Sequence, residues 1–237
     1  MKAIKKDITN LKKKIITKET LKIIIRKNKP LYKDTSIRWT IYKLVSEGVI
    51  SKVDNNLYYL GKLKKYTPKN FSALRNKIKN KLEASLKDIR FIIYESTNLN
   101  EWVNHQISKN VIFVEVEKYF MMDVFRLIQE FHNNVLFSPS VDEFYLYQGD
   151  LVVVNQLITQ APINNQTREM KLEKLIVDFY TKDLINEFIN DSEKENIIYS
   201  ILSTYQINRK TILAYAKRRN NYAKIKDVLE QIEGRRS

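Results

Sequence analysis

The stretch from Asp34 to Leu60 constrains the fold more than any other part of the 237-residue sequence. Its first half has apolar residues at positions i, i+4, i+7 and i+8, the spacing of one face of an α-helix: Ile37, Ile41, Leu44 and Val45. Gly48 follows, and glycine commonly ends a helix because it adopts a left-handed conformation without a Cβ clash. Residues 49–53 and 57–60 are β-prone and flank Asp54, Asn55 and Asn56, which tolerate a positive φ. We therefore predict an amphipathic helix followed by a β-hairpin.

Two further helices are predicted ahead of this stretch. Ile4, Ile8 and Leu11 have helical spacing near the amino terminus. Thr17 can cap a second helix that extends through Arg26, because its hydroxyl can accept a hydrogen bond from a free amide at the helix start. Asp34 or Thr35 would cap the third helix in the same way. Three helices and a hairpin within about sixty residues are the order of a winged helix-turn-helix. The alternative is a helix-hairpin unit that only packs.

Charge is divided unevenly along the chain. Residues 1–90 contain 25 Lys and Arg against 7 Asp and Glu (+18), residues 91–207 contain 8 against 17 (−9), and residues 208–237 contain 9 against 3 (+6). Cations that neutralise phosphates release condensed counterions, so the amino-terminal charge favours DNA as a partner. The acidic middle favours a different partner with a basic surface.

Candidate DNA contacts lie on the exposed face of the predicted third helix and on the hairpin. The start of a recognition helix enters the major groove, where Arg38 can bind guanine through two hydrogen bonds. Trp39 can contact a thymine methyl or a sugar, or it can instead pack on the hairpin, and the sequence favours neither. The complete set is Lys33, Thr35, Ser36, Arg38, Trp39 and Lys43 on the helix and Lys52, Asn55 and Asn56 on the hairpin.

Residues 63–88 are predicted to form a linker and a basic connecting helix. Apolar residues recur there every four positions: Leu74, Ile78, Leu82 and Leu86. The other faces carry cations that either extend a DNA footprint or are simply solvated: Arg75, Lys77, Lys79, Lys81 and Lys87.

From Arg90 onwards, short β-branched segments alternate with helices, which predicts an α/β layer of a sheet covered by helices. The predicted strands are RFIIYES, VIFVEV, NVLFS and LVVVNQLI. The predicted helices are Leu99–Ile107 and Tyr119–Phe131, and a polar loop is expected at Pro162–Arg168.

An all-helical segment is predicted to close the chain. Its first helix has an apolar stripe of Leu172, Leu175, Ile176 and Phe179. Ser192 and Glu195 suggest a capping box at the start of the next helix, and Asn208 can cap the one after it. A second basic patch there is a further candidate for nucleic-acid contact: Arg209, Lys210, Lys217, Arg218 and Arg219. For Lys217, Arg218 and Arg219, stabilisation of the negative end of the helix is an equal explanation.

These patterns predict a mixed α+β protein in three parts. The first is an N-terminal winged helix-turn-helix domain at residues 1–62, and the second is the basic linker and connecting helix at 63–88. The third is an α/β domain with a helical C-terminal segment at 89–237. No apolar stretch reaches the roughly 18 residues of a membrane span, and the amino terminus lacks a signal-peptide core. We therefore expect a cytoplasmic protein without a membrane partner.

Few side chains are suited to catalysis. The chain has no cysteine and only two histidines, His105 and His132, and its four glycines are too scattered for a phosphate-binding loop. A metal-dependent nuclease could use Glu115, Glu117 and Asp150 with Lys118. However, Lys118 is one residue after Glu117 and three after Glu115, so on a strand it faces away from both. We expect no enzyme activity, metal or cofactor, and nuclease activity is the less favoured alternative.

Four segments of the chain, with Trp102 ahead of them, form a recognisable set: FVEVEK at 113–118, LITQAPI at 157–163, LEKLIVDFYTKDL at 172–184 and YQINRKTILAYAKRRN at 205–220. Together they resemble the AbiEi-type antitoxins of type IV toxin–antitoxin systems. The resemblance implies a transcriptional autorepressor that binds inverted repeats in double-stranded DNA, as a monomer in solution or a dimer on DNA. It also implies an antidote to a nucleotidyltransferase-like toxin in a phage-defence (abortive infection) operon. A stand-alone winged-helix regulator without a toxin partner is the alternative.

Overall fold

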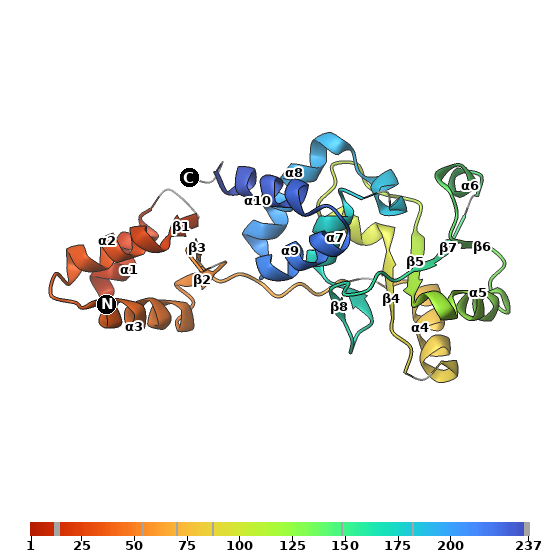
Figure 1. Ribbon diagram of the computed structural model, residues 1–237, viewed down its shortest axis with the longest axis horizontal. Helices are drawn as coiled ribbons and strands as arrows, with labels where there is room; N and C mark the ends of the chain where they lie inside the picture. Colours follow the sequence, from red (N-terminus) through yellow and green to blue (C-terminus); the bar gives the residue numbers. More distant parts are fainter. Residues whose placement is uncertain are drawn as a thin grey trace.

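The computed structural model describes residues 1–11, 15–53, 55–69, 71–86, 88–147, 149–181 and 183–234. The fold is mixed α and β, about 51% helical, with several small sheets, which confirms the predicted class at this level. The molecule is elongated, with an N-terminal unit (residues 1–60) at one end and a larger body (residues 71–234) at the other (Figure 1). Within the described residues, no helix is long and apolar enough to cross a membrane.

The N-terminal unit has a small core of its own. Its elements are α1 (Lys2–Thr9), β1 (Ile15–Thr17), α2 (Lys18–Asn28), α3 (Asp34–Ser46), β2 (Ile50–Lys52) and β3 (Leu57–Leu60). The apolar faces of the three predicted helices meet around Ile8, Leu21 and Leu44. Thr17 caps α2 as predicted, since its hydroxyl accepts a hydrogen bond from the Thr20 amide at 3.1 Å. The predicted helices and hairpin are confirmed as elements, and Asp54 at the predicted turn lies outside the described residues.

Two details of the N-terminal unit differ from the predictions. The strand β1 was not predicted, and it pairs antiparallel with β3 to complete a three-stranded sheet of order β1-β3-β2. The residue that precedes α3 is Lys33, and no side chain caps this helix. Asp34 instead pairs with Arg26 at 2.8 Å, which explains why its carboxylate does not cap the helix.

The body is built on a four-stranded sheet of order β4-β5-β7-β6. These strands are β4 (Phe91–Glu95), β5 (Val111–Val116), β6 (Val135–Phe137) and β7 (Leu151–Gln156), as predicted. The pair β4/β5 is antiparallel, whereas β5/β7 and β6/β7 are parallel. Helices α4 (Ala73–Ser85) and α5 (Met121–Gln129) enclose one apolar core on this sheet, and the C-terminal helices enclose another. Burial on both faces explains why the strands are continuous apolar runs.

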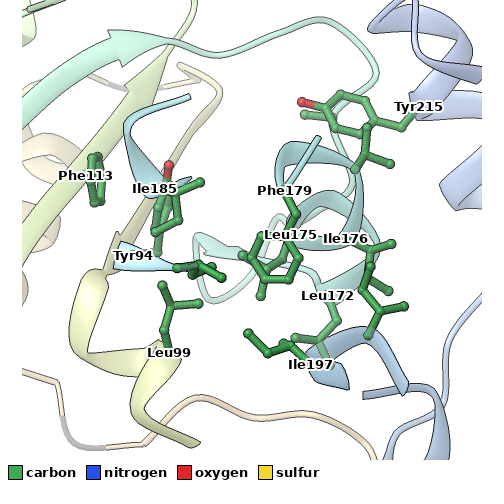
Figure 2. Packing of buried hydrophobic residues seen from close by; sticks show 14 of the residues in the cluster. Tyr94, Leu99, Phe113, Leu172, Leu175, Ile176, Phe179, Ile185, Ile197 and Tyr215 are labelled. Carbon is green, nitrogen blue, oxygen red and sulfur yellow. The ribbon is translucent and has the colours of Figure 1, made fainter. Parts of the chain in front are cut away.

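The C-terminal helices surround α7 (Leu172–Asp178), which is buried on all sides. They are α8 (Asp191–Thr204), α9 (Arg209–Arg218) and α10 (Tyr222–Gly234), while the short α6 (Val141–Tyr145) follows β6. Figure 2 shows the predicted stripe of α7, including Leu175 and Phe179, among Ile185, Ile197 and Tyr215 from other segments. Asn208 caps α9 as predicted, accepting a bond from the Thr211 amide at 3.2 Å.

Three local predictions in the body are wrong. Residues 99–107 are not an α-helix, because a short 3₁₀ helix, η1 (Ser96–Glu101), is followed by irregular backbone. There the Asn100 side chain bonds the amide and the carbonyl of Ile107 and so competes with helical hydrogen bonding. The polar loop contains a hairpin of β8 (Ile163–Asn164) and β9 (Glu169–Met170). Helix α8 starts after Asn190, ahead of the predicted cap Ser192, and an Asp191–Lys194 ion pair of 2.6 Å lies in its first turn.

The linker lies against the body in an extended conformation. The Lys64 amide donates to the Thr204 carbonyl at 2.9 Å, and the Gln206 amide donates to the Lys64 carbonyl at 2.8 Å. The Tyr66 ring packs on Trp102 and Tyr205, with centroid distances of 5.6 and 5.2 Å. The segment between the two parts is therefore held by backbone bonds and aromatic packing.

Candidate nucleic-acid interface

The predicted contacts on α3 lie together on its exposed face. The opposite face is anchored in the core of the N-terminal unit by Ile37, Ile41 and Leu44. Because the helix repeats every 3.6 residues, most positions between these anchors point to solvent, while Thr40 is buried with them. The exposed residues are Lys33, Thr35, Arg38, Trp39 and Lys43, and Ser36 is partly exposed.

Trp39 does not pack on the hairpin. Its side chain is 69% exposed, which contradicts that alternative. Its ring lies next to Tyr42, also 69% exposed, with centroids 6.4 Å apart and planes tilted by 59°. The sequence prediction omitted Tyr42, although a spacing of three residues from Trp39 places it on the same helix face.

The hairpin contacts lie apart from the start of α3. Lys52, Asn55 and Asn56 are exposed, and the Asn56 carbonyl accepts a bond from the amide of Lys18 at 2.8 Å. The turn is therefore beside the first residue of α2, whereas the Arg26–Asp34 ion pair places the start of α3 beside the last turn of α2. An 11-residue helix such as α2 is about 16 Å long. The contacts at the start of α3 and those on the hairpin thus form two clusters at opposite ends of α2, and Lys43 lies farther along α3 in its last turn.

The second basic patch is largely used in contacts within the body. Arg219 pairs with Asp183 at 2.9 Å, and Arg209 lies 3.8 Å from Glu230. The Arg218 Nε atom donates to the Thr159 hydroxyl. Lys210 and Lys217 are exposed. The three arginines therefore have side-chain partners within the body, which neither predicted explanation had named.

Among the described residues, the connecting helix differs from the prediction at one cation, and Lys87 lies outside them. Arg75 is 3% exposed, so it does not lie on a solvated face. Its guanidinium group stacks over Phe71 at 3.9 Å and lies 3.7 Å from a Glu169 oxygen. Burial is the main cause that lowers the pKa of Arg75, and Glu169 opposes this effect. Arg75 therefore packs α4 against the body and does not extend a basic surface.

Glu115, one of the carboxylates considered for nuclease chemistry, lies in a buried ionic cluster. It accepts hydrogen bonds from the Tyr94 hydroxyl at 2.7 Å and from Lys174 Nζ at 2.8 Å. Lys174 also bonds Asp178 at 2.5 Å, and the Tyr215 hydroxyl donates to Asp178 at 3.2 Å. Tyr94 and Tyr215, labelled in Figure 2, show where this cluster lies in the core. The carboxylate of Glu115 is therefore enclosed among side-chain partners.

The remaining nuclease candidates are elsewhere. Glu117, Lys118 and Asp150 are exposed, outside the core that contains Glu115. In the part of the chain that the structure describes, no three His, Asp or Glu side chains form a group that could hold a metal ion.

One lysine between two carboxylates sets the electrostatics of the ionic cluster. Burial raises the pKa of Asp178 to about 7, and this effect exceeds the opposing attraction of Lys174. Burial also opposes the charge on Lys174, but the carboxylates of Asp178 and Glu115 outweigh it and raise the pKa of this lysine. Near neutral pH, Lys174 is therefore charged, and Asp178 takes up a proton more readily than an ordinary aspartate because burial raises its pKa.

Comparison with known proteins places most of the chain in one family. Residues 36–235 match the model of DUF6577, which is described as a family of unknown function. The match starts on α3 and includes its exposed rings as well as the ionic cluster of the body. A search among curated proteins found no match. Since the family model covers more than half of the sequence, the chain belongs to the DUF6577 family.

Proposed function

We propose that the chain is a DNA-binding transcriptional regulator whose N-terminal unit is a winged helix-turn-helix. The order α1-β1-α2-α3-β2-β3, with a sheet of order β1-β3-β2, supports this assignment. In it, α3 is the recognition helix and the β2–β3 hairpin is the wing. The observation that carries the proposal is the exposed face of α3, where Arg38, Trp39 and Lys43 project from a helix anchored by three buried residues.

The two clusters of candidate contacts suit a DNA duplex. The major groove is about 12 Å wide. A wing that lies a similar distance from the recognition helix would therefore contact the DNA backbone beside the groove. The net charge of +18 on residues 1–90 supplies the phosphate contacts. The absence of a side-chain cap on α3 also leaves its first amides able to bind a phosphate.

The resemblance to AbiEi-type antitoxins extends the proposal to a biological role. In this role the chain acts in the cytoplasm, binds an inverted repeat at its own promoter and represses its operon. It also restrains a nucleotidyltransferase-like toxin encoded beside it, in defence against phage. The net charge of −9 on residues 91–207 supports contact with a basic partner. One observation distinguishes an antitoxin from a stand-alone regulator. For a stand-alone regulator, expression of the adjacent gene without this chain would not arrest growth.

The DNA-binding proposal is tested by replacing Arg38 and Lys43 with alanine together. Both side chains are exposed, so the variant should fold normally. We expect its affinity for the upstream inverted repeat to fall at least tenfold in a gel-shift or anisotropy titration. Each lost phosphate contact should also lower the slope of log K against log salt by about 0.9.

A double replacement of Arg126 and Lys171 with alanine is the matched control, because it removes the same charge from exposed positions of the body that lie outside both predicted sets of contacts. We expect this control to bind DNA like the unmodified chain. Unchanged binding by the Arg38/Lys43 variant would rule out α3 as the recognition helix.

A further inference from the structure

Three aromatic side chains are exposed around the first half of α3. Tyr32 in the preceding turn is 38% exposed, and Trp39 and Tyr42 are more exposed still. The core of the N-terminal unit contains one buried aromatic residue, Tyr58, on the hairpin. The three exposed rings therefore lie outside the packing of the unit. Large apolar groups gathered on a surface commonly mark a binding site.

Two of these rings, those of Tyr32 and Trp39, border an open depression of about 410 Å³, and the Tyr42 ring lies next to Trp39 outside its lining. Its lining consists of Tyr32, Thr35, Ser36, Trp39 and Thr40. The Thr40 hydroxyl donates a hydrogen bond to the Ser36 carbonyl at 2.8 Å. Its oxygen can still accept a hydrogen bond from a ligand. The depression thus combines aromatic faces with small hydroxyl groups. Nucleic-acid-binding proteins use this combination to stack a base on a ring and to hydrogen-bond its edge.

Part of the exposed face of α3 is not suited to reading base edges in an intact duplex. Edge recognition uses Arg or Lys on guanine, Asn or Gln on adenine, and Ser or Thr on either. On α3, Arg38 and Lys43 can bind guanine in this way, whereas the exposed Trp39 and Tyr42 between them in the sequence belong to none of these pairings. In a duplex, each base already stacks on its neighbours, so an aromatic ring cannot reach its face. An unpaired or extruded base exposes that face, and stacking on a ring contributes about 1–3 kcal/mol.

The charge around the rings favours a nucleic acid over a protein partner. Lys33, Arg38 and Lys43 are exposed on the same helix as Trp39, and the nearby Asp34 carboxylate is paired with Arg26. A polyanionic strand would therefore meet cations on both sides of the rings, with the adjacent carboxylate already neutralised.

We propose that Trp39, with Tyr32 and Tyr42, forms a stacking site for one unstacked nucleobase. The N-terminal unit would accordingly prefer DNA with an unpaired base to an intact duplex of the same sequence. This inference rests on the proposed DNA-binding function, and it specifies the DNA structure that the site selects.

The test uses three oligonucleotides of one sequence: an intact duplex, a duplex with a single bulged base, and the single strand. The chain should bind the bulged duplex about tenfold more tightly than the intact one, since tenfold corresponds to about 1.4 kcal/mol. Trp39→Ala should remove this preference, whereas Trp39→Phe should retain most of it. Tyr119→Ala is the matched control, an exposed aromatic residue of the body, and it should change neither affinity.

Fluorescence gives a second, independent measurement. The chain has two tryptophans. Trp102→Phe keeps a ring against Tyr66 and Tyr205 and leaves Trp39 as the single reporter. The bulged base should quench this emission more strongly than the intact duplex does.

Each possible outcome decides the inference. Equal affinity for the intact and bulged duplexes, with equal quenching, would overturn the stacking site and leave the DNA-binding function standing. Failure to bind all three oligonucleotides would overturn the proposed function as well. Self-association that Trp39→Ala abolishes, without a preference for bulged DNA, would show that the rings contact a second copy of the chain and would also overturn the inference.

Discussion

The N-terminal unit and the body place their charged side chains in opposite environments. Residues 1–60 have no buried charged residue among those described. The buried polar and charged residues of the body include Arg75, Glu95, Glu115, Glu169, Glu173, Lys174 and Asp178. The N-terminal unit thus keeps its charged side chains in solvent, whereas the body brings several charged side chains into its core.

This difference predicts where charged residues contribute to folding. A buried charge costs free energy unless a partner of opposite charge and hydrogen bonds compensate for it. Replacement of a charged residue in the body should therefore act on stability. An exposed charge in the N-terminal unit contributes little to folding, so its replacement should act on binding. The predictions below test this contrast.

The largest expected effect is that of Lys174→Met. This change removes the cation that lies between Glu115 and Asp178 and leaves two buried carboxyl groups without a counter-charge. The loss of one partner from a buried ion pair typically costs about 3–5 kcal/mol. We expect a decrease of this order in the free energy of unfolding, measured by denaturant titration with circular dichroism.

Lys217→Met is the control for this change, because Lys217 is exposed at the end of α9. Its effect should stay within about 0.5 kcal/mol. If the two variants were equally stable, the ionic cluster would not contribute to folding and the contrast between the two regions would fail.

The second prediction concerns the pH dependence of stability. The pKa of Asp178 is about 7 in the folded protein and 3.8 as an ordinary side chain, so between these values the folded state binds more protons than the unfolded state. Its contribution to stability is therefore complete below about pH 4 and is lost as the pH rises through 7. Asp178→Asn removes this titration. The stability of the unmodified chain, relative to that of the variant, should thus be greater at pH 5 than at pH 8.

The difference in free energy of unfolding between the unmodified chain and Asp178→Asn is taken at each pH. This difference cancels the contributions of the other titrating groups. The effect should be smaller than that of Lys174→Met, because Lys174 still compensates the ionised Asp178. A difference that grows with pH would instead show that the lysine stabilises the carboxylate and keeps the Asp178 pKa low. The pair would then be an ordinary ion pair.

Much of the fold could be predicted because it depends on local spacing. The apolar positions of α2 and α3 repeat with the helical period, and the central strands are runs of β-branched residues long enough to recognise. The strand β1 (Ile15–Thr17) has three residues and no period of its own, and it forms because residues 57–59 of β3 offer it a free edge. The prediction of a helix at residues 99–107 was wrong because the Asn100 side chain forms hydrogen bonds that replace helical ones.

The functional residues also include some that local spacing predicts and others that depend on residues far apart in the sequence. The helical period places Arg38, Trp39 and Lys43 on one face, but only the three-dimensional position of the hairpin decides that Trp39 is exposed. Lys174 and Asp178 are four residues apart on α7, so their pairing was visible in the sequence. Their third partner, Glu115, is 59 residues from Lys174 along the chain, a contact that no local pattern reveals. The burial of Arg75 depends in the same way on distant residues.

The smallest expected effect is that of Trp39→Ala on stability, and it tests the contrast most directly. Replacement of a tryptophan in a protein core by alanine typically lowers the free energy of unfolding by about 3–5 kcal/mol. Trp39 is 69% exposed, so the free energy of unfolding should change by no more than about 0.5 kcal/mol. For a chain of this size, that corresponds to a shift in Tm of about 1–2 °C in a thermal melt. Ile41→Ala on the same helix, where the side chain is buried, should cost about 2–5 kcal/mol. A loss of more than about 2 kcal/mol for Trp39→Ala would show that the ring packs within the N-terminal unit. In that case the aromatic surface would be part of the fold, and its exposure could no longer be attributed to a partner.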